Sequence, residues 1–113
     1  MTDCLFCKIV RGEIPSHKVH ETDELIVFKD INPQAPVHLL IVPKKHIPQL
    51  SYAENSDAEL LGKVQLAARD LAAQHQIQEG YRLLVNNGRG AGQTVFHIHY
   101  HLLGGRPLKW PPG

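Results

Sequence analysis

The segment FHIHYHLLGG, residues 96–105, places a histidine at every second position inside an apolar run. Side chains of an extended strand alternate between its two faces, so this period puts all three imidazole rings on one face. The apolar residues between them then take the opposite face. We therefore predict a strand over residues 94–103 with one titratable and one apolar face. The histidines are His97, His99 and His101, and the alternating apolar residues are Ile98, Tyr100 and Leu102.

Three imidazole rings side by side fit three kinds of chemistry. They can hold a catalytic zinc ion with water as the fourth ligand. One neutral ring can instead attack phosphorus to form a covalent intermediate, if a partner fixes its tautomer and donors hold the phosphate oxygens. The rings can also simply hold an anion. A purely structural role is disfavoured, because burying three imidazoles without compensating interactions costs free energy.

The composition limits the class of protein. The chain has 113 residues, 42% hydrophobic and 20% charged, which suits a single domain over residues 1–113. Its formal net charge is +1, so no global field attracts nucleic acid or acidic lipid, and neither is expected as a partner. No apolar run approaches the ~20 residues that span a membrane. Residues 1–10 are too polar for a signal peptide, so a cytoplasmic protein with reduced cysteines is expected.

Hydrophobic patterning predicts a short helix in an N-terminal arm (residues 1–10), several strands, one long helix and two further strands. Ser56 and Glu59 have the spacing of a capping box, which predicts that the long helix begins there and fades near His75. A loop joins the last two strands, which favours antiparallel pairing. The predicted fold class is therefore α+β, with about five antiparallel strands. The expected strands cover residues 19–21, 25–28, 37–42, 81–86 and 94–103, followed by an irregular tail over residues 104–113.

A glycine-rich loop, NNGRGAGQT at residues 86–94, precedes the histidines. Glycines at positions 88, 90 and 92 let backbone amides approach an anion without a side chain in the way. Gln93 and Thr94 add polar donors. The loop alone is typical of a flexible hairpin, but next to three imidazoles it indicates a phosphate site.

The residues alone leave two further features open. Cys4 and Cys7 form a CxxC, which is half of a zinc site, a redox pair or two free structural cysteines. Asp30 is either a turn aspartate or an acceptor for ribose hydroxyls. In the second case, an apolar slot for a base would be made by Phe6, Ile9, Phe28 and Ile31. His38 and His46, taken singly, are expected to be satisfied structural histidines.

Several motifs together carry a family resemblance. They are HIHYHLL at residues 97–103, FKDINPQAP at 28–36, IVPKKH at 41–46, GQTVF at 92–96 and LGGRPLKWPPG at 103–113. With these motifs nearly the whole chain resembles the histidine-triad (HIT) superfamily in its nucleotide-binding Hint branch. The resemblance implies a half-barrel whose sheets join in a homodimer, with the C-terminal tail near the partner's site. It also implies hydrolysis of purine nucleoside phosphoramidates to AMP or GMP and an amine through a nucleotidyl-histidine.

The same resemblance assigns roles to individual residues. His99, the central histidine, would be the nucleophile, and His101 would bind the phosphate. The other nucleotide contacts would come from Thr94 and Gln93 at the phosphate and leaving amine, Asn86 and the Gly92 amide in the same pocket, Asp30 at the ribose, and Phe6, Ile9, Phe28 and Ile31 at the base.

Some members of the family also carry a structural zinc that catalysis does not require. Its ligands here would be Cys4, Cys7, His46 and His97. The alternative to an enzyme is a zinc-stabilised nucleotide- or partner-binding module with little catalysis. The chain departs from the family pattern at Tyr100, where an aliphatic residue is usual, and at Thr94, where many members have serine. We expect Tyr100 to point away from the site.

Overall fold

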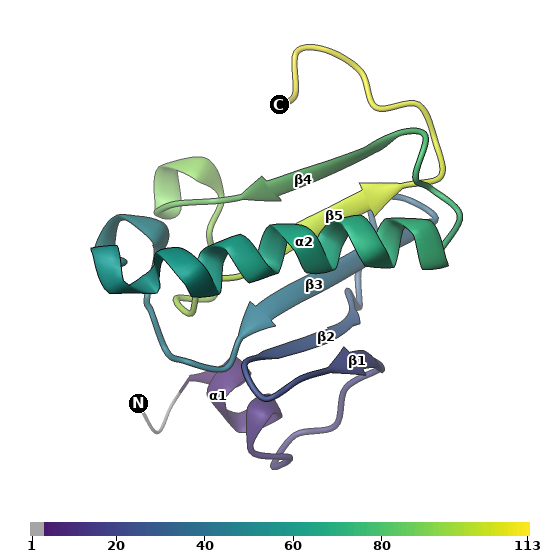
Figure 1. Cartoon of the computed structure of the whole chain (residues 1–113). Coiled ribbons are helices and arrows are strands. Elements are labelled where there is room, and N and C mark those ends of the chain that lie inside the picture. Colours follow the sequence, from purple (N-terminus) through teal and green to yellow (C-terminus); the bar gives the residue numbers. More distant parts are fainter. Residues whose placement is uncertain (1–3) are drawn as a thin grey trace.

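The computed structural model describes residues 4–113, and five strands form one antiparallel sheet in the order β1-β2-β3-β5-β4 (Figure 1). This confirms the predicted α+β fold, including the antiparallel pairing of the last two strands. The elements are α1 (Leu5–Val10), β1 (Lys18–Glu21), β2 (Leu25–Lys29), β3 (Val37–Pro43), α2 (Ala58–Gln74), β4 (Tyr81–Val85) and β5 (Tyr100–Gly104), with 3-10 turns at Leu50–Tyr52, Asn55–Asp57 and Arg89–Ala91. None of the helices within residues 4–113 combines the length and apolarity needed to cross a membrane.

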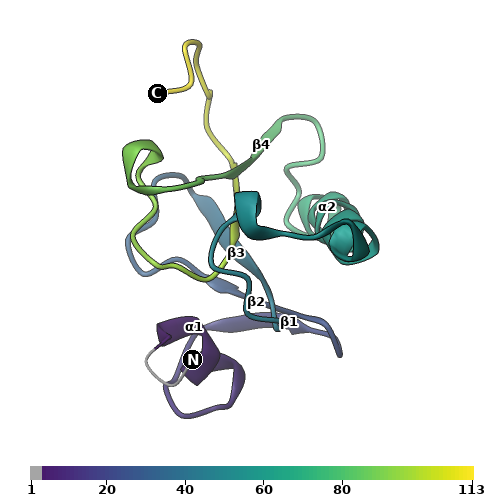
Figure 2. The ribbon, with the colours of Figure 1, turned by 90° about the vertical axis from the view of Figure 1, so that its left-hand side faces the viewer.

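The sheet is covered on both faces. The long helix α2 packs on one face over a large hydrophobic cluster, and α1 packs on the other over a smaller one (Figure 2). Strand β2 contributes to both, because Leu25 and Val27 enter the large cluster while Ile26 and Phe28 enter the small one. Strands buried on both faces are apolar without interruption, which explains the runs LIVF in β2 and LLIV in β3.

The start of α2 differs from the prediction. The expected capping box between Ser56 and Glu59 is wrong, because a 3-10 turn at Asn55–Asp57 precedes a helix that begins at Ala58. The buried carboxylate of Asp57 accepts a hydrogen bond from the Glu54 amide at 2.9 Å and pairs with Lys45 at 2.5 Å. The residue that caps the turn before α2 is therefore Asp57, two residues before the predicted Glu59.

The histidine segment is only partly a strand. Strand β5 begins at Tyr100, so the prediction of a strand from residue 94 is wrong for residues 94–99. The ladder with β3 ends at the pair of Ile41 and Tyr100, and upstream of it the Ile98 amide donates to the Ile47 carbonyl instead. Alternation nevertheless persists, because Ile98 and Tyr100 lie in the cluster under α2 and His99 lies against Phe6 on the other face. Tyr100 thus points away from the histidine face, as expected.

Candidate functional site

A cavity of about 350 Å³ opens beside α1 and the histidine segment. It gathers residues from α1, β2, β3, the segment before β5 and β5 itself. Eight of the predicted nucleotide-contacting residues line it, namely Phe6, Ile9, Phe28, Asp30, Ile31, Thr94, His99 and His101. The base-slot residues form its apolar wall, and Ile31 is a lip at the rim with 95% of its surface exposed. The fold therefore brings together, in one cavity, residues that lie up to 95 positions apart in sequence.

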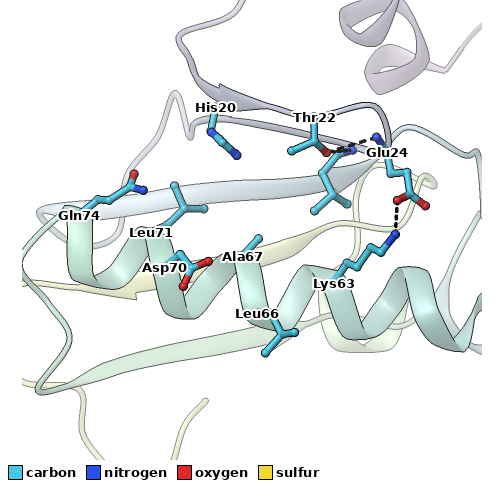
Figure 3. Close-up of a pocket in the computed structure, with 10 residues that line it drawn as sticks. His20, Thr22, Glu24, Lys63, Leu66, Ala67, Asp70, Leu71 and Gln74 are labelled. Carbon is cyan, nitrogen blue, oxygen red and sulfur yellow. Dashed lines mark hydrogen bonds and ion pairs between the residues drawn. The ribbon is translucent and has the colours of Figure 1, made fainter.

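A second pocket of about 360 Å³ lies between α2 and the β1–β2 turn (Figure 3). Three of its polar residues, Thr22, Glu24 and Lys63, contact one another. Lys63 pairs with Glu24 at 2.5 Å, and the Thr22 hydroxyl accepts from the amides of Glu24 and Leu25. None of the predicted site residues lines it, so we locate the candidate active site in the cavity beside α1.

His99 is held as a neutral ring with a free lone pair. Its Nδ1 lies 2.7 Å from the carbonyl oxygen of His97, and because a carbonyl only accepts, Nδ1 carries the proton. Burial lowers the pKa of His99, which is 7% exposed, so the neutral form prevails at pH 7. Its Nε2 therefore bears the lone pair on a ring that lines the cavity. The Phe6 ring meets the imidazole edge-on, with 4.9 Å between centroids and an angle of 88°.

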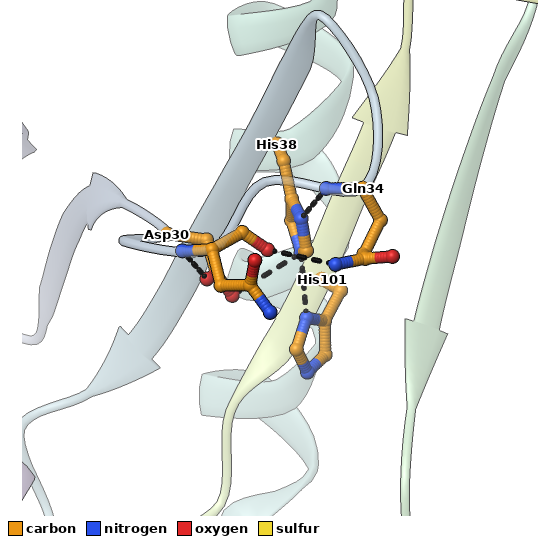
Figure 4. A network of polar contacts seen from close by, with 5 residues as sticks. Asp30, Gln34, His38 and His101 are labelled. Carbon is orange, nitrogen blue, oxygen red and sulfur yellow. Dashed lines mark hydrogen bonds and ion pairs between the residues drawn. The ribbon is translucent and has the colours of Figure 1, made fainter.

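His101 has the opposite tautomer, which is set by a chain of hydrogen bonds (Figure 4). The Gln34 backbone amide donates to His38 Nδ1 at 3.0 Å, so the proton of neutral His38 is on Nε2. That Nε2 lies 2.9 Å from His101 Nδ1, which must accept, and 3.4 Å from Asp30 Oδ2. The proton of His101 is thus on Nε2. Burial, and then the neighbouring His99 and His38, lower the pKa of His101 to about 4.

His38 is the residue that sequence reasoning missed. It is 7% exposed, and burial lowers its pKa, opposed in part by the Asp30 carboxylate. The strand register brings it to His101, because Leu40 of β3 faces His101 and His38 is its diagonal neighbour on the same face. Only that register, which the sequence does not reveal, could have identified it. Asp30 also accepts from the Asn32 amide at 2.7 Å, so it is a turn aspartate and a cavity residue at once.

Four predicted metal ligands converge on one point. His46 Nδ1 and His97 Nδ1 are 3.1 Å apart. Cys4 Sγ lies 3.2 Å from His97 Nδ1, and Cys7 Sγ lies 3.4 Å and 3.5 Å from the nitrogens of His46 and His97. Tetrahedral zinc, with bonds of about 2.0 Å to nitrogen and about 2.3 Å to sulfur, separates such atoms by roughly 3.3–3.6 Å. His97 Nε2 donates to the Pro43 carbonyl at 2.6 Å, which leaves the Nδ1 lone pair directed at the thiols. Cys4, Cys7, His46 and His97 therefore fit a metal ion.

A second cluster, made of Asp30, His38 and His101, is also compact enough for a metal. Its protons argue against that use. The Gln34 amide occupies the Nδ1 lone pair of His38, so Nε2 carries the proton. A metal ion would need a lone pair on that Nε2. The cluster is therefore arranged as a hydrogen-bond chain.

The glycine-rich loop is built around Gln93. Its buried side chain accepts from the Gly88 amide at 2.8 Å and donates to the carbonyls of Pro48 and Val95. Gly88 and Gly92 have φ angles of 87° and 93°, which only glycine adopts readily. In this arrangement Gln93, like Asn86 and Gly92, does not line the cavity, whereas Thr94 does.

Comparison with known proteins agrees with this architecture. The family model for the HIT domain matches residues 11–108. An uncharacterized HIT-like protein of Synechocystis is 55% identical over 98% of this chain and 97% of its own length. A HIT family hydrolase from Legionella pneumophila superimposes with a TM-score of 0.97 and 52% identity over 98% of this chain and all of its own. A histidine triad nucleotide-binding protein from Candida albicans superimposes with a TM-score of 0.82 and 37% identity, over 96% of this chain and 83% of its own. The chain therefore belongs to the HIT domain family.

Proposed function

We propose that this protein is a hydrolase that cleaves purine nucleoside 5′-phosphoramidates to a nucleoside monophosphate and an amine. The observation that carries the proposal is the pair of opposite tautomers in one cavity. His99 offers an unprotonated Nε2 that can attack phosphorus, and His101 offers an Nε2–H that can hold a phosphate oxygen. The similar structures from Legionella and from Clostridium thermocellum, both described as HIT family hydrolases, support a hydrolytic activity.

The reaction would proceed in two steps, formation of a nucleotidyl-histidine and its hydrolysis. The His99 Nε2 lone pair forms a bond to phosphorus, the substrate P–N bond breaks, and the leaving amine takes up one proton from solvent. Water then attacks the nucleotidyl-histidine, the bond from phosphorus to His99 breaks, and one proton returns to solvent. The His97 carbonyl stabilises the charge that develops on the His99 ring by accepting its Nδ1–H.

The cavity supplies a place for each part of a nucleotide. The base would enter the apolar slot of Phe6, Ile9 and Phe28, with Ile31 closing over its edge. Asp30 would accept from the ribose, and Thr94 would donate to the phosphate beside His101. Asn86, Gly92 and Gln93 would shape the glycine-rich loop, residues 86–94, beside the phosphate. AMP-like compounds are therefore the substrates to test first.

The metal cluster would hold a structural Zn²⁺ through Cys4, Cys7, His46 and His97. When bound, the ion would cross-link the N-terminal arm with α1 to the segments that carry His46 and His97. The proposed reaction needs no metal, because the nucleophile and the phosphate donor are imidazoles outside this cluster. A catalytic zinc on the three triad histidines is not favoured, since His97 is directed at the thiols while His101 Nδ1 is directed at His38.

We also propose a homodimer joined along β4. This edge strand is apolar but only half-buried at Leu83, Leu84 and Val85. The opposite edge, β1, is shielded by exposed charged or polar residues, namely Lys18, His20 and Glu21. The β4 edge is thus the one suited to pairing with a second copy, and sedimentation equilibrium measures whether it does.

The decisive experiment is a covalent trap. Protein mixed with substoichiometric AMP-phosphoramidate labelled at phosphorus should retain acid-labile label on His99 in a rapid quench. The His99→Asn variant is the matched control and should retain none. If AMP binds but neither single-turnover label nor product appears, the protein is a nucleotide-binding module instead.

A further inference from the structure

We propose that metal binding and nucleotide binding in this protein are energetically coupled through α1. This inference rests on the proposed function, because it takes the cavity beside α1 to be a nucleotide site. The structure assigns to the Cys4, Cys7, His46 and His97 cluster, called here the metal cluster, control over one wall of that cavity.

The metal cluster joins α1 to the sheet. Cys4 is the N-cap of α1, its sulfur accepting from the Cys7 amide at 3.3 Å, and Cys7 lies in the first turn. The two histidine ligands come from elsewhere, His46 from the segment after β3 and His97 from the segment before β5. A helix of six residues is too short to be stable alone. Its position therefore depends on side-chain packing and on the link between the thiols and the histidines, either direct contacts or a shared metal ion.

The cavity wall lies on the same short helix. Phe6 stands between the two cysteines in sequence, and its ring packs 4.9 Å from His99 and 5.5 Å from Phe28. Leu5 and Ile9 line the same cavity. Because Phe6 and the thiols are at most two residues apart, a metal that fixes the thiols also fixes the ring that abuts the nucleophile.

Coupling follows from this shared element. Without metal, α1 opens locally more often, and each opening removes the base-slot wall and the contact on His99. A bound nucleotide holds Phe6 and Ile9 in place and so favours the metal cluster in turn. Thermodynamic linkage requires the two effects to be equal, so metal and nucleotide must strengthen each other by the same factor.

The test is a thermodynamic cycle with Zn²⁺ and AMP on the full chain. Calorimetric titration of AMP into metal-free and zinc-loaded protein, and titration of zinc against a chromophoric chelator with and without AMP, should each show tightening of about tenfold. Equal AMP affinity in the two forms would overturn the coupling. Absence of AMP binding in both forms would instead refute the proposed nucleotide site, so the two failures are distinguishable.

Two variants and one further measurement locate the effect. Phe6→Leu should keep its zinc affinity and lose most of the coupling, whereas Leu66→Ala, on the exposed side of α2, should keep both. Hydrogen exchange without AMP should show α1 amides slowed by zinc and α2 amides unchanged. If zinc removal unfolds α2 as well, as read by far-ultraviolet circular dichroism, control through α1 alone is wrong.

Discussion

Two histidine pairs flank His99, and their ring nitrogens approach to nearly the same distance but with opposite proton arrangements. His46 and His97 bring two ring nitrogens to 3.1 Å, and His38 and His101 bring two to 2.9 Å. In the first pair the Pro43 carbonyl accepts a hydrogen bond from His97 Nε2, so the Nδ1 lone pair faces two sulfurs. In the second, the Gln34 amide fills the lone pair on His38 Nδ1, so a proton lies between the rings. The backbone partner of each pair, rather than the histidine itself, decides between metal ligand and hydrogen-bond chain.

The largest expected effect comes from the residue between the pairs. His99→Ala should lower kcat by at least about 10³-fold, because it removes the imidazole lone pair that would attack phosphorus, while the Nε2 of His101 carries a proton instead. AMP should still bind, since the apolar slot and His101 remain. Steady-state kinetics and calorimetry measure the two quantities. Substantial turnover by the variant would disprove the nucleophilic role.

Breaking the hydrogen-bond chain should have the next largest effect. His38→Ala leaves His101 Nδ1 without its donor, so the ring no longer has to carry its proton on Nε2. We expect kcat to fall by about 10–100-fold with little change in KM, because a misoriented His101 weakens a donor whose complete loss typically costs about 10²–10³-fold. His46→Ala is the matched control in the other pair. It should lose zinc and stability while keeping its kcat far closer to that of the wild type, and equal kcat losses in both variants would contradict the division of roles.

Breaking the metal cluster should act on stability. The Cys4→Ser, Cys7→Ser double variant should bind no stoichiometric zinc and melt about 10 °C lower, which corresponds to about 2 kcal/mol for a domain of this size. Calorimetry and metal analysis check this. The His38→Ala variant should retain one zinc per chain. Zinc retained by the double variant would place the metal on other ligands.

The two sides of His99 were not equally predictable from sequence. The alternating pattern around His99, the family motifs and the CxxC were sufficient to propose the nucleophile and four metal ligands. The role of His38 was not, because it depends on the register of β3 against β5 and on a backbone amide at Gln34. The strand limits were also missed for the histidine segment, since the Ile98 amide bonds to the carbonyl of Ile47, which is distant in sequence. Local patterns are readable in a chain, but backbone partners supplied by tertiary structure are not.

A smaller effect should appear in the pH dependence of stability. Burial lowers the pKa of folded His101 to about 4, below the value of about 6.5 expected in the unfolded chain. Between these values the unfolded state binds more protons, so this group stabilises the fold above pH 6.5 and that stability is lost as the pH falls toward 4. His101→Asn removes the group, so its melting temperature should decline less steeply over this window. Parallel curves for wild type and variant would mean that His101 does not contribute.

The smallest expected effect concerns the positions of the imidazole protons, which can be measured directly without changing structure or activity. Long-range ¹H–¹⁵N correlation spectra at pH 7 should show His38 and His101 protonated at Nε2, and His99 alone of these three protonated at Nδ1. Adding zinc should shift the Nδ1 resonance of His97 and leave the tautomers of His38 and His101 unchanged. The opposite tautomer at His38 would require the Gln34 amide to lose its acceptor. In that case His38 Nε2 would be free to bind a metal, and the distinction between the two histidine pairs would no longer hold.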